Sequence, residues 1–320
     1  MKQQILNYEL ATDTLRGLTA DPKYLLSKYF YDDAGSAIFQ DIMQMPEYYL
    51  TDCEFEIFTT YRKQISESFH EGVQAFDLIE LGSGDGLKTK ILLQFLVNNA
   101  VDFRYIPIDI SHKANVDLLN SLKSELPVLN VSPKTGDYFQ EVEKLNGYSG
   151  LRKVFLFLGS NIGNFSDDEI DRFFSQLSTL CHKGDKLLVG FDLKKSPEVI
   201  MKAYSDPHGH TRRFNLNHLI RINRELNANF NPENFEHQAV YDPQTGAAKS
   251  FLVSTVVQSV YIADLNERIH FDKWEPIFME LSRKFDQSTI ERIAAEHGFG
   301  VESQFTDKRD YFVNSLWVKK

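Results

Sequence analysis

The residues of this chain best suited to chemistry form a glycine-rich turn between an apolar segment and an amphipathic one. The turn lies within 78–89, where Gly82, Gly84 and Gly86 follow the spacing G-x-G-x-G. Glycine has no Cβ, so backbone amides and the amino terminus of the following helix can approach a polar ligand closely. The pattern by itself also suits a plain strand-to-helix turn, so its meaning depends on the residues that accompany it.

An acidic residue at the end of the next predicted strand, Asp109, supports a ligand site. The carboxyl ends of neighbouring parallel strands meet at one edge of a sheet, where this carboxylate can accept both hydroxyls of a ribose. The turn and the acid suit a nicotinamide cofactor and S-adenosylmethionine alike. Three further features favour the methyl donor: Glu80 extends the turn to E-x-G-x-G-x-G, 136–138 resembles an adenine-contacting turn, and the chain ends in a predicted helix and antiparallel hairpin.

The segment that follows the fourth predicted strand, 157–165, bears on the acceptor. It lacks the D/N-P-P-Y/F motif with which nucleic-acid amino-methyltransferases hold a flipped base. Asn164 can offer its amide to a small zwitterion, although an asparagine that holds its own turn fits equally well. Ser166 and Glu169 form a capping box, so we interpret the acidic run there as a helix start and not as a metal site.

Composition and charge restrict the partners. The 320 residues include 35 basic and 45 acidic side chains, and no dense basic block follows a phosphate backbone, so we expect a small polar substrate and no nucleic acid. No apolar run approaches the ~20 residues that cross a bilayer, and the amino terminus lacks a secretory signal. We therefore expect a cytoplasmic monomer without membrane contact. Cys53 and Cys181 stand alone, and His208 and His210 lack a third ligand, so neither a disulfide nor a metal is expected.

Hydrophobic patterning predicts the elements that position these residues. The amino-terminal part is expected to be helical at 24–30, at 35–43 and from Thr51, where Thr51 and Glu54 form a capping box. Short apolar strands then alternate with amphipathic segments. The predicted strands are 76–81, 103–108, 128–131, 154–158 and 186–193. Such alternation is typical of a mostly parallel sheet with helices on both faces.

The alternation stops at Lys194, where an excursion from the sheet begins. Helix is predicted over 194–230, strands over 235–241 and 250–262 around a turn at 242–246, then a helix at 287–297 and strands at 301–305 and 311–318. The prediction is an α/β fold, with a Rossmann-like sheet that ends in an antiparallel hairpin and a second α+β domain. We expect the donor-binding domain at 55–194 and 285–320, and the substrate-binding domain at 1–54 and 195–284.

Several stretches spread along the chain resemble one family. They are Tyr29–Ser36, Pro46–Tyr49, Glu80–Thr89, Gly159–Phe165, Ala203–Asp206, Phe214–Asn217, Arg221–Leu226 and Glu280–Phe285. Through them nearly the whole chain resembles the histidine Nα-methyltransferases of ergothioneine biosynthesis. This resemblance implies a class I methyltransferase sheet and S-adenosylmethionine as the cofactor.

The resemblance also implies roles for individual residues. Those expected to bind the donor are Tyr31, Gly82, Gly84, Lys88, Asp109, Asp137 and Tyr138, with Tyr31 near the point of methyl transfer. Those expected to bind the amino acid are Tyr48, Asn164 and Tyr204 at its main-chain groups and Glu280 and Ser282 at its imidazole. Tyr31 and Asn164 are the catalytic candidates. Hydroxyls and an amide suit this task, because they bind a carboxylate without adding positive charge that repels the sulfonium.

These roles predict transfer of methyl groups from S-adenosylmethionine to the α-amine of histidine, up to the trimethylated betaine, hercynine. Three departures from the usual sequence of the family leave another amino acid or small amine open as the substrate. Asn161 stands where threonine is usual, Phe285 where tyrosine is common, and 271–276 lacks a frequent glycine–glutamate pair. A nicotinamide-dependent oxidoreductase or a nucleotide sensor without catalysis is the more distant alternative.

Overall fold

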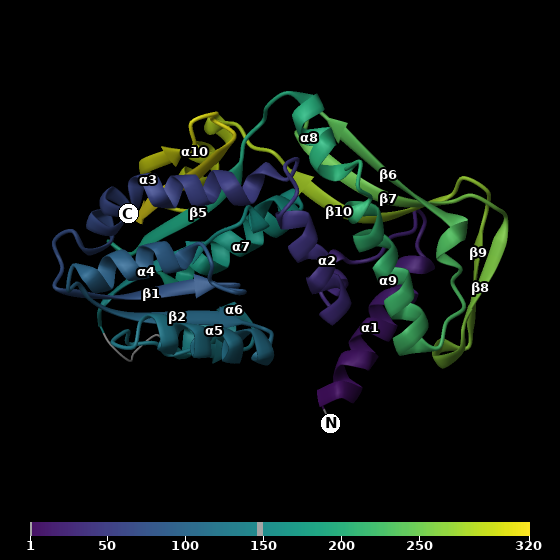
Figure 1. Ribbon diagram of the computed structural model, residues 1–320, viewed down its shortest axis with the longest axis horizontal. Coiled ribbons are helices and arrows are strands. Elements are labelled where there is room, and N and C mark those ends of the chain that lie inside the picture. The colour runs from purple at the N-terminus through teal and green to yellow at the C-terminus, as the bar shows by residue number, and fades with distance from the viewer. Residues whose placement is uncertain (1, 146–149) are drawn as a thin grey trace. The chain divides into compact units, whose positions relative to one another are not determined.

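A computed structural model describes residues 2–145 and 150–320 and divides into two compact units (Figure 1). Unit 1 holds the chain up to Tyr49 together with Lys195–Arg283, and unit 2 holds Leu50–Lys194 together with Lys284–Lys320. The prediction that one part of the chain binds the donor and the other the substrate stays a prediction. Among the described residues, no helix has the length and apolar character needed to cross a membrane.

Unit 2 is built on a seven-stranded sheet in the order β11-β12-β5-β4-β1-β2-β3. Its strands are β1 (Ala75–Leu81), β2 (Asp102–Asp109), β3 (Lys134–Thr135), β4 (Arg152–Phe157), β5 (Lys186–Asp192), β11 (Phe299–Thr306) and β12 (Phe312–Lys319). The first five are parallel, whereas β12 pairs antiparallel with both β5 and β11. The predicted Rossmann-like sheet with an antiparallel carboxyl-terminal hairpin is confirmed.

Helices cover both faces of this sheet. On one face α6 (Tyr138–Leu145), α7 (Asp167–Leu180) and α10 (Gln287–Glu296) share a buried cluster with inward side chains of the strands, among them Phe157 and Phe173 with ring centroids 4.5 Å apart. The other helices of the unit are α3 (Tyr49–His70), α4 (Thr89–Asn98) and α5 (His112–Glu125). Phe69 of α3 contacts Phe76 of β1 on the opposite face. The sheet core is therefore closed on both sides, and in open sheets of this kind ligands bind at the carboxyl edge.

Unit 1 combines helices with two small antiparallel sheets. Its helices are α1 (Lys2–Leu18), α2 (Asp33–Met43), α8 (Pro197–Tyr204) and α9 (His210–Leu226), with 3₁₀ turns η1 (Ser27–Phe30), η3 (Pro232–Asn234) and η4 (Ala263–Leu265). Strands β6 (Phe235–Asp242), β7 (Ala247–Ser254) and β10 (Pro276–Arg283) form a sheet in the order β10-β7-β6, and β8 (Gln258–Ile262) pairs with β9 (Glu267–Phe271). One buried cluster joins the helices to the strands, with Phe30, Phe214 and Ile277 among its members.

Two of the local predictions in the amino-terminal part are wrong. The segment 24–30 forms only the short turn η1, because the Leu25 amide pairs with the carbonyl of Phe278 instead of a helical partner. The long helix begins at Tyr49 and not at a cap on Thr51. Glu54 does not cap it, because this buried carboxylate pairs with Lys88.

Two predicted strands also differ from the structure. No strand covers 128–131, where Val131 makes only an isolated bridge to Tyr105, and the edge strand is Lys134–Thr135. The predicted strand 250–262 is two strands, β7 and β8, because the chain turns after Ser254 and leaves Val257 65% exposed. By contrast, the capping box of Ser166 and Glu169 is present as predicted.

Candidate functional site

The glycine-rich turn connects β1 to α4 at the carboxyl edge of the sheet. Gly82 and Gly84 adopt positive φ angles of 75° and 51°, which disfavour any residue with a Cβ. A Cβ built on either glycine would meet no atom within 4 Å, so open space adjoins the turn. The Gly82 amide donates to the carbonyl of Ile108 at 2.8 Å, which fixes the turn beside the end of β2.

The buried side chain of Glu80 holds this turn in place. Its buried carboxylate accepts hydrogen bonds from Thr89 Oγ1 at 2.7 Å and from the Tyr105 hydroxyl, and so links β1 to α4 and β2. Burial raises the pKa of Glu80 to about 7. The first acid of the E-x-G-x-G-x-G pattern therefore holds the turn in place and does not face the open space.

Asp109 ends β2 next to the turn. Its Oδ2 accepts the Gly84 amide at 3.1 Å and its Oδ1 accepts the Ser111 amide at 2.8 Å. A carboxylate has about four acceptor positions, so two remain for the hydroxyls of a ribose. The structure thus brings Asp109 and the glycine turn together as the sequence requires.

The turn after β3 lies beside Asp109, whose backbone carbonyl accepts the Gly136 amide at 3.1 Å. Asp137 Oδ1 accepts the amides of Phe139 and Gln140, both at 3.1 Å, and so caps the start of α6. Burial and then the negative charges of Asp109 and Asp137 raise the pKa of Tyr138. The predicted donor-binding residues Asp109, Asp137 and Tyr138 therefore share one end of the sheet.

Lys88 lies at the same edge, and it has a partner that the sequence did not reveal. Glu54 of α3 is fully buried, pairs with the Lys88 ammonium and accepts the Gly159 amide at 3.1 Å. The Lys88 side chain keeps 24% of its surface exposed, so it can reach a ligand while Glu54 fixes its position. The pattern around Thr51 concealed this role, because it suggested a local helix cap for Glu54.

Asn164 ends the 3₁₀ turn η2 (Asn161–Asn164), which follows β4. Its side chain is half-buried and makes no hydrogen bond with any residue that the structure describes. The interpretation that this amide holds its own turn therefore does not fit, and the amide is available to a ligand. Its role toward an amino acid stays a prediction.

The residues predicted to bind the imidazole lie together in unit 1. Glu280 and Ser282 alternate along β10, so both side chains point to the same face of its sheet. The Tyr204 hydroxyl, at the end of α8, donates to Ser282 Oγ at 2.7 Å. A carboxylate and two hydroxyls gathered on one face can accept and donate hydrogen bonds to a polar ring.

Tyr31 adjoins this group. Its ring contacts Phe39 and Phe214 edge-on, with centroids 5.4 and 5.5 Å away, and Phe39 in turn contacts Tyr48 at 6.0 Å. Tyr31 is 48% exposed over the whole residue. Desolvation and then the charges of Glu280 and Tyr204 raise the pKa of its hydroxyl above the ordinary value.

Two groups of predicted residues result. The donor group, which we define as Gly82, Gly84, Lys88, Asp109, Asp137 and Tyr138, lies in unit 2 with Asn164. The acceptor group, defined as Tyr48, Tyr204, Glu280 and Ser282, lies in unit 1, together with Tyr31, which the resemblance assigns to the donor. His210 is engaged elsewhere, with Nδ1 2.7 Å from the Arg213 guanidinium. Within 2–145 and 150–320 no trio of histidine, cysteine or acidic side chains is arranged to hold a metal ion.

Comparison with known proteins agrees with this chemistry. Residues 10–319 match the family described as histidine-specific, S-adenosylmethionine-dependent methyltransferases. The chain is 32% identical to histidine N-alpha-methyltransferase of Mycobacterium tuberculosis and 34% identical to that of Mycolicibacterium smegmatis, in each case over 97% of this chain and 95% of the relative. It is 28% identical to ergothioneine biosynthesis protein 1 of Schizosaccharomyces pombe, over 71% of this chain and 30% of that protein. These matches confirm the resemblance and favour the methyl donor over the nicotinamide cofactor that the turn and Asp109 left open.

Proposed function

Since the chain belongs to the family of histidine-specific methyltransferases that use S-adenosylmethionine, we propose that it methylates the α-amine of L-histidine. The observation that carries this proposal is the match to two histidine N-alpha-methyltransferases, which covers nearly the full length of this chain and of each relative. The acceptor group supports it independently, because Glu280, Ser282 and Tyr204 offer hydrogen bonds suited to an imidazole.

On the donor side, each residue has a chemically simple task. The open turn at Gly82 and Gly84 admits the methionine part of the donor, Asp109 accepts its ribose hydroxyls, and Lys88 binds its single carboxylate. S-adenosylmethionine supplies a methyl group that is already activated by the sulfonium. The protein therefore acts mainly by holding the two reactants in line and by excluding water.

On the acceptor side, Glu280 accepts the imidazole N–H, while Tyr48, Tyr204 and Asn164 hold the carboxylate and the amine of the amino acid. An α-amine has a reference pKa of about 8, so a substantial share of it is protonated near neutral pH and must lose a proton before it attacks. The raised pKa of Tyr31 keeps its phenol neutral there. Tyr31 thus accepts a hydrogen bond from an N–H of the amine and so orients the free lone pair, and the ammonium proton passes to solvent.

We further propose that methyl transfer repeats until the nitrogen is trimethylated. A neutral phenol and an amide can accommodate an amine that loses N–H donors with each round, whereas a fixed carboxylate at the nitrogen would hold the charged ammonium and oppose its deprotonation. The quaternary product has no N–H and no lone pair, so transfer ends there.

Mass spectrometry of histidine incubated with the enzyme and methyl-labelled donor tests the proposal. We expect products with one, two and three added methyl groups, and fragmentation should place them on the α-nitrogen. Nα-acetylhistidine, whose amine is blocked, is the matched control substrate and should gain no methyl group. A panel of other amino acids and small amines tests the alternative acceptor, and preferential turnover of any of them would refute histidine as the substrate.

A variant links the activity to the acceptor group. Glu280→Gln should raise the KM for histidine while leaving S-adenosylhomocysteine affinity unchanged, because the residue lies in the acceptor group and not in the donor group. Unchanged histidine use in this variant would exclude Glu280 as the imidazole partner.

A further inference from the structure

Tyr31 lies at the corner of a tight turn that joins η1 to α2. Its backbone angles, φ −91° and ψ 61°, and the hydrogen bond from the Asp32 amide to the Phe30 carbonyl at 3.2 Å define an inverse γ-turn. Such a turn is a single-residue bend with one hydrogen bond across it. Its stability as a rigid platform must therefore come from contacts on either side.

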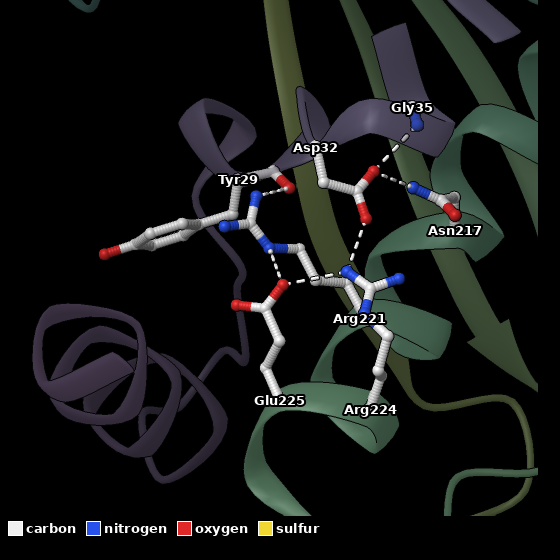
Figure 2. Close-up of polar contacts among 7 residues, drawn as sticks. All are labelled: Tyr29, Asp32, Gly35, Asn217, Arg221, Arg224 and Glu225. Carbon is white, nitrogen blue, oxygen red and sulfur yellow. Dashed lines mark hydrogen bonds and ion pairs between the residues drawn. The ribbon is translucent and has the colours of Figure 1, made fainter. Parts of the chain in front are cut away.

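The carboxylate of Asp32 makes the contacts on the carboxyl side (Figure 2). Its Oδ1 accepts the Gly35 amide at 2.7 Å and the Asn217 side-chain amide at 2.8 Å, and its Oδ2 accepts the Arg224 guanidinium at 2.6 Å. Although burial alone raises it, these three donors hold the pKa of Asp32 below the ordinary value. The side chain stays ionised and is only 9% exposed.

Helix α9 also holds the amino side of the turn. Arg221 donates to the backbone carbonyl of Tyr29 at 2.9 Å, and Glu225 accepts both Arg221 Nε at 3.0 Å and Arg224 at 2.8 Å (Figure 2). Arg221 thus bonds to the residues before the turn and Arg224 to Asp32 after it, and the Glu225 carboxylate joins the two arginines. Tyr31 is flanked on both sides by bonds to the same helix.

Packing leaves the turn little freedom to move. Phe30 is fully buried, and a Cβ on Gly35 would lie 1.8 Å from the Phe30 carbonyl oxygen, so only glycine fits there. Tyr31 itself stays 48% exposed while its neighbours are buried or bonded. The arrangement presents one phenol from a rigid base.

We propose that Asp32 is a positioning residue for Tyr31, and that Asn217 and Arg224 of α9 act with it to fix the phenol for methyl transfer. This inference rests on the proposed function, because it assigns the reason for the arrangement to that reaction. Asp32 touches neither reactant in this account and acts through the γ-turn. A simpler role, as an amino-terminal cap that stabilises α2, predicts different results below.

Asp32→Asn separates the two roles. Asparagine caps helices as well as aspartate does, so the bond to Gly35 can persist. Since the Gly35 amide and the Asn217 amide share Oδ1, the side-chain NH₂ then takes the place of Oδ2 and faces the Arg224 guanidinium, which is also a donor, and the ion pair is lost. Asp41→Asn is the matched control, because Asp41 also joins α2 to α9, through Arg213 at 2.9 Å, yet lies on the exposed surface away from the turn.

We expect Asp32→Asn to lower kcat by about tenfold to hundredfold, the effect of a displacement near 1 Å in a catalytic group, with the KM for the donor unchanged. Asp41→Asn should retain the wild-type kcat. In the Tyr31→Phe background Asp32→Asn should cause no further loss, since it acts through the Tyr31 hydroxyl. An equal loss with and without that hydroxyl would overturn the proposal and leave the cap as its role.

A second measurement does not depend on turnover. With fluorotyrosine incorporated, the Tyr31 resonance, assigned through Tyr31→Phe, should be one narrow ¹⁹F line in the wild type and in Asp41→Asn, and broadened or split in Asp32→Asn. An unchanged ¹⁹F line in Asp32→Asn refutes the positioning role of Asp32 even if histidine is methylated. Absence of methylation with a broadened line refutes only the proposed function. Should Asp32→Asn fail to fold, Asn217→Ala supports or refutes the proposal by the same line shape.

Discussion

Replacement of Asp109 by asparagine tests the donor site most directly. In the structure this carboxylate holds the Gly84 amide at 3.1 Å and the Ser111 amide at 2.8 Å, one on each oxygen. Asparagine has nearly the same shape but only one oxygen. Its NH₂ group must face one of the two amides, both of which are donors, so the variant loses one bond to the protein or rearranges its contact with the ribose.

The expected magnitude follows from the bonds at stake. A hydrogen bond to a charged group contributes about 1.5–3 kcal/mol, and a neutral amide retains only part of it. Since about 1.4 kcal/mol corresponds to a factor of ten, Asp109→Asn should raise the Kd for S-adenosylhomocysteine by about tenfold to hundredfold. Free energy of unfolding should change less, because Gly82 still anchors the turn to Ile108 at 2.8 Å.

Isothermal titration calorimetry with S-adenosylhomocysteine measures this loss. Asp85→Asn is the matched control, because Asp85 lies in the same turn and its Oδ1 accepts the neighbouring Leu87 amide at 3.0 Å. It removes the same charge without touching the proposed ribose contact, so its Kd should stay within about threefold of the wild type, since exposed charges contribute little. Equal losses in the two variants would show that net charge, and not a ribose bond, governs affinity, and would refute the reasoning.

Three further predictions concern neighbours of the turn. Lys88→Met should weaken the binding of S-adenosylhomocysteine but not that of 5′-methylthioadenosine, which lacks the carboxylate. Adding Glu54→Gln to this variant should restore the Tm without restoring the affinity for S-adenosylhomocysteine. Because burial raises the pKa of Glu80 to about 7, above its unfolded value of 4.5, the folded state retains a proton that the unfolded state releases. The free energy of unfolding, measured by denaturant titration relative to Glu80→Gln, should therefore fall by about 3 kcal/mol as pH rises from 4.5 to 7 and then level off. Gly86→Ala, at φ 63° and with a Cβ 2.6 Å from a leucine of α5, should lower Tm more than Gly184→Ala, at φ 88° with open space; equal Tm losses would mean that steric contact adds nothing.

The parallel sheet was predictable because its signals are local and repeated. Each central strand is buried on both faces and reads as a short apolar run, and the intervening helices show their own period. The edge was not predictable in this way. Val128 is apolar but 79% exposed, and the chain there pairs with Tyr105 only through the Asn130 carbonyl and the Ser132 amide. Position in the sheet, not residue type, decides where an edge strand forms.

The predicted strand 250–262 failed for a related reason. Its composition is rich in β-branched residues throughout, yet the Thr255 amide pairs with the carbonyl of Asn234 at 2.9 Å and Ser254 Oγ bonds to the Val256 carbonyl at 2.8 Å. These contacts turn the chain between β7 and β8. A break that depends on a partner such as Asn234, outside the segment itself, leaves no mark in the apolar pattern.

The difference between local sequence signals and contacts made by distant residues also explains what resemblance can and cannot tell about a site. Motif positions named the groups that we propose bind the ligands, but the bonds that hold these groups join residues far apart in sequence, 34 positions for Glu54 and Lys88 and 185 for Asp32 and Asn217. A local pattern even assigned Glu54 to a helix cap, although its carboxylate is buried against Lys88. Catalysis by positioning requires rigidity as much as the right functional groups. The residues that supply this rigidity become visible only when the folded contacts are known, which is why Asp32 and Glu54 emerge from the structure and Tyr31 and Lys88 from the sequence.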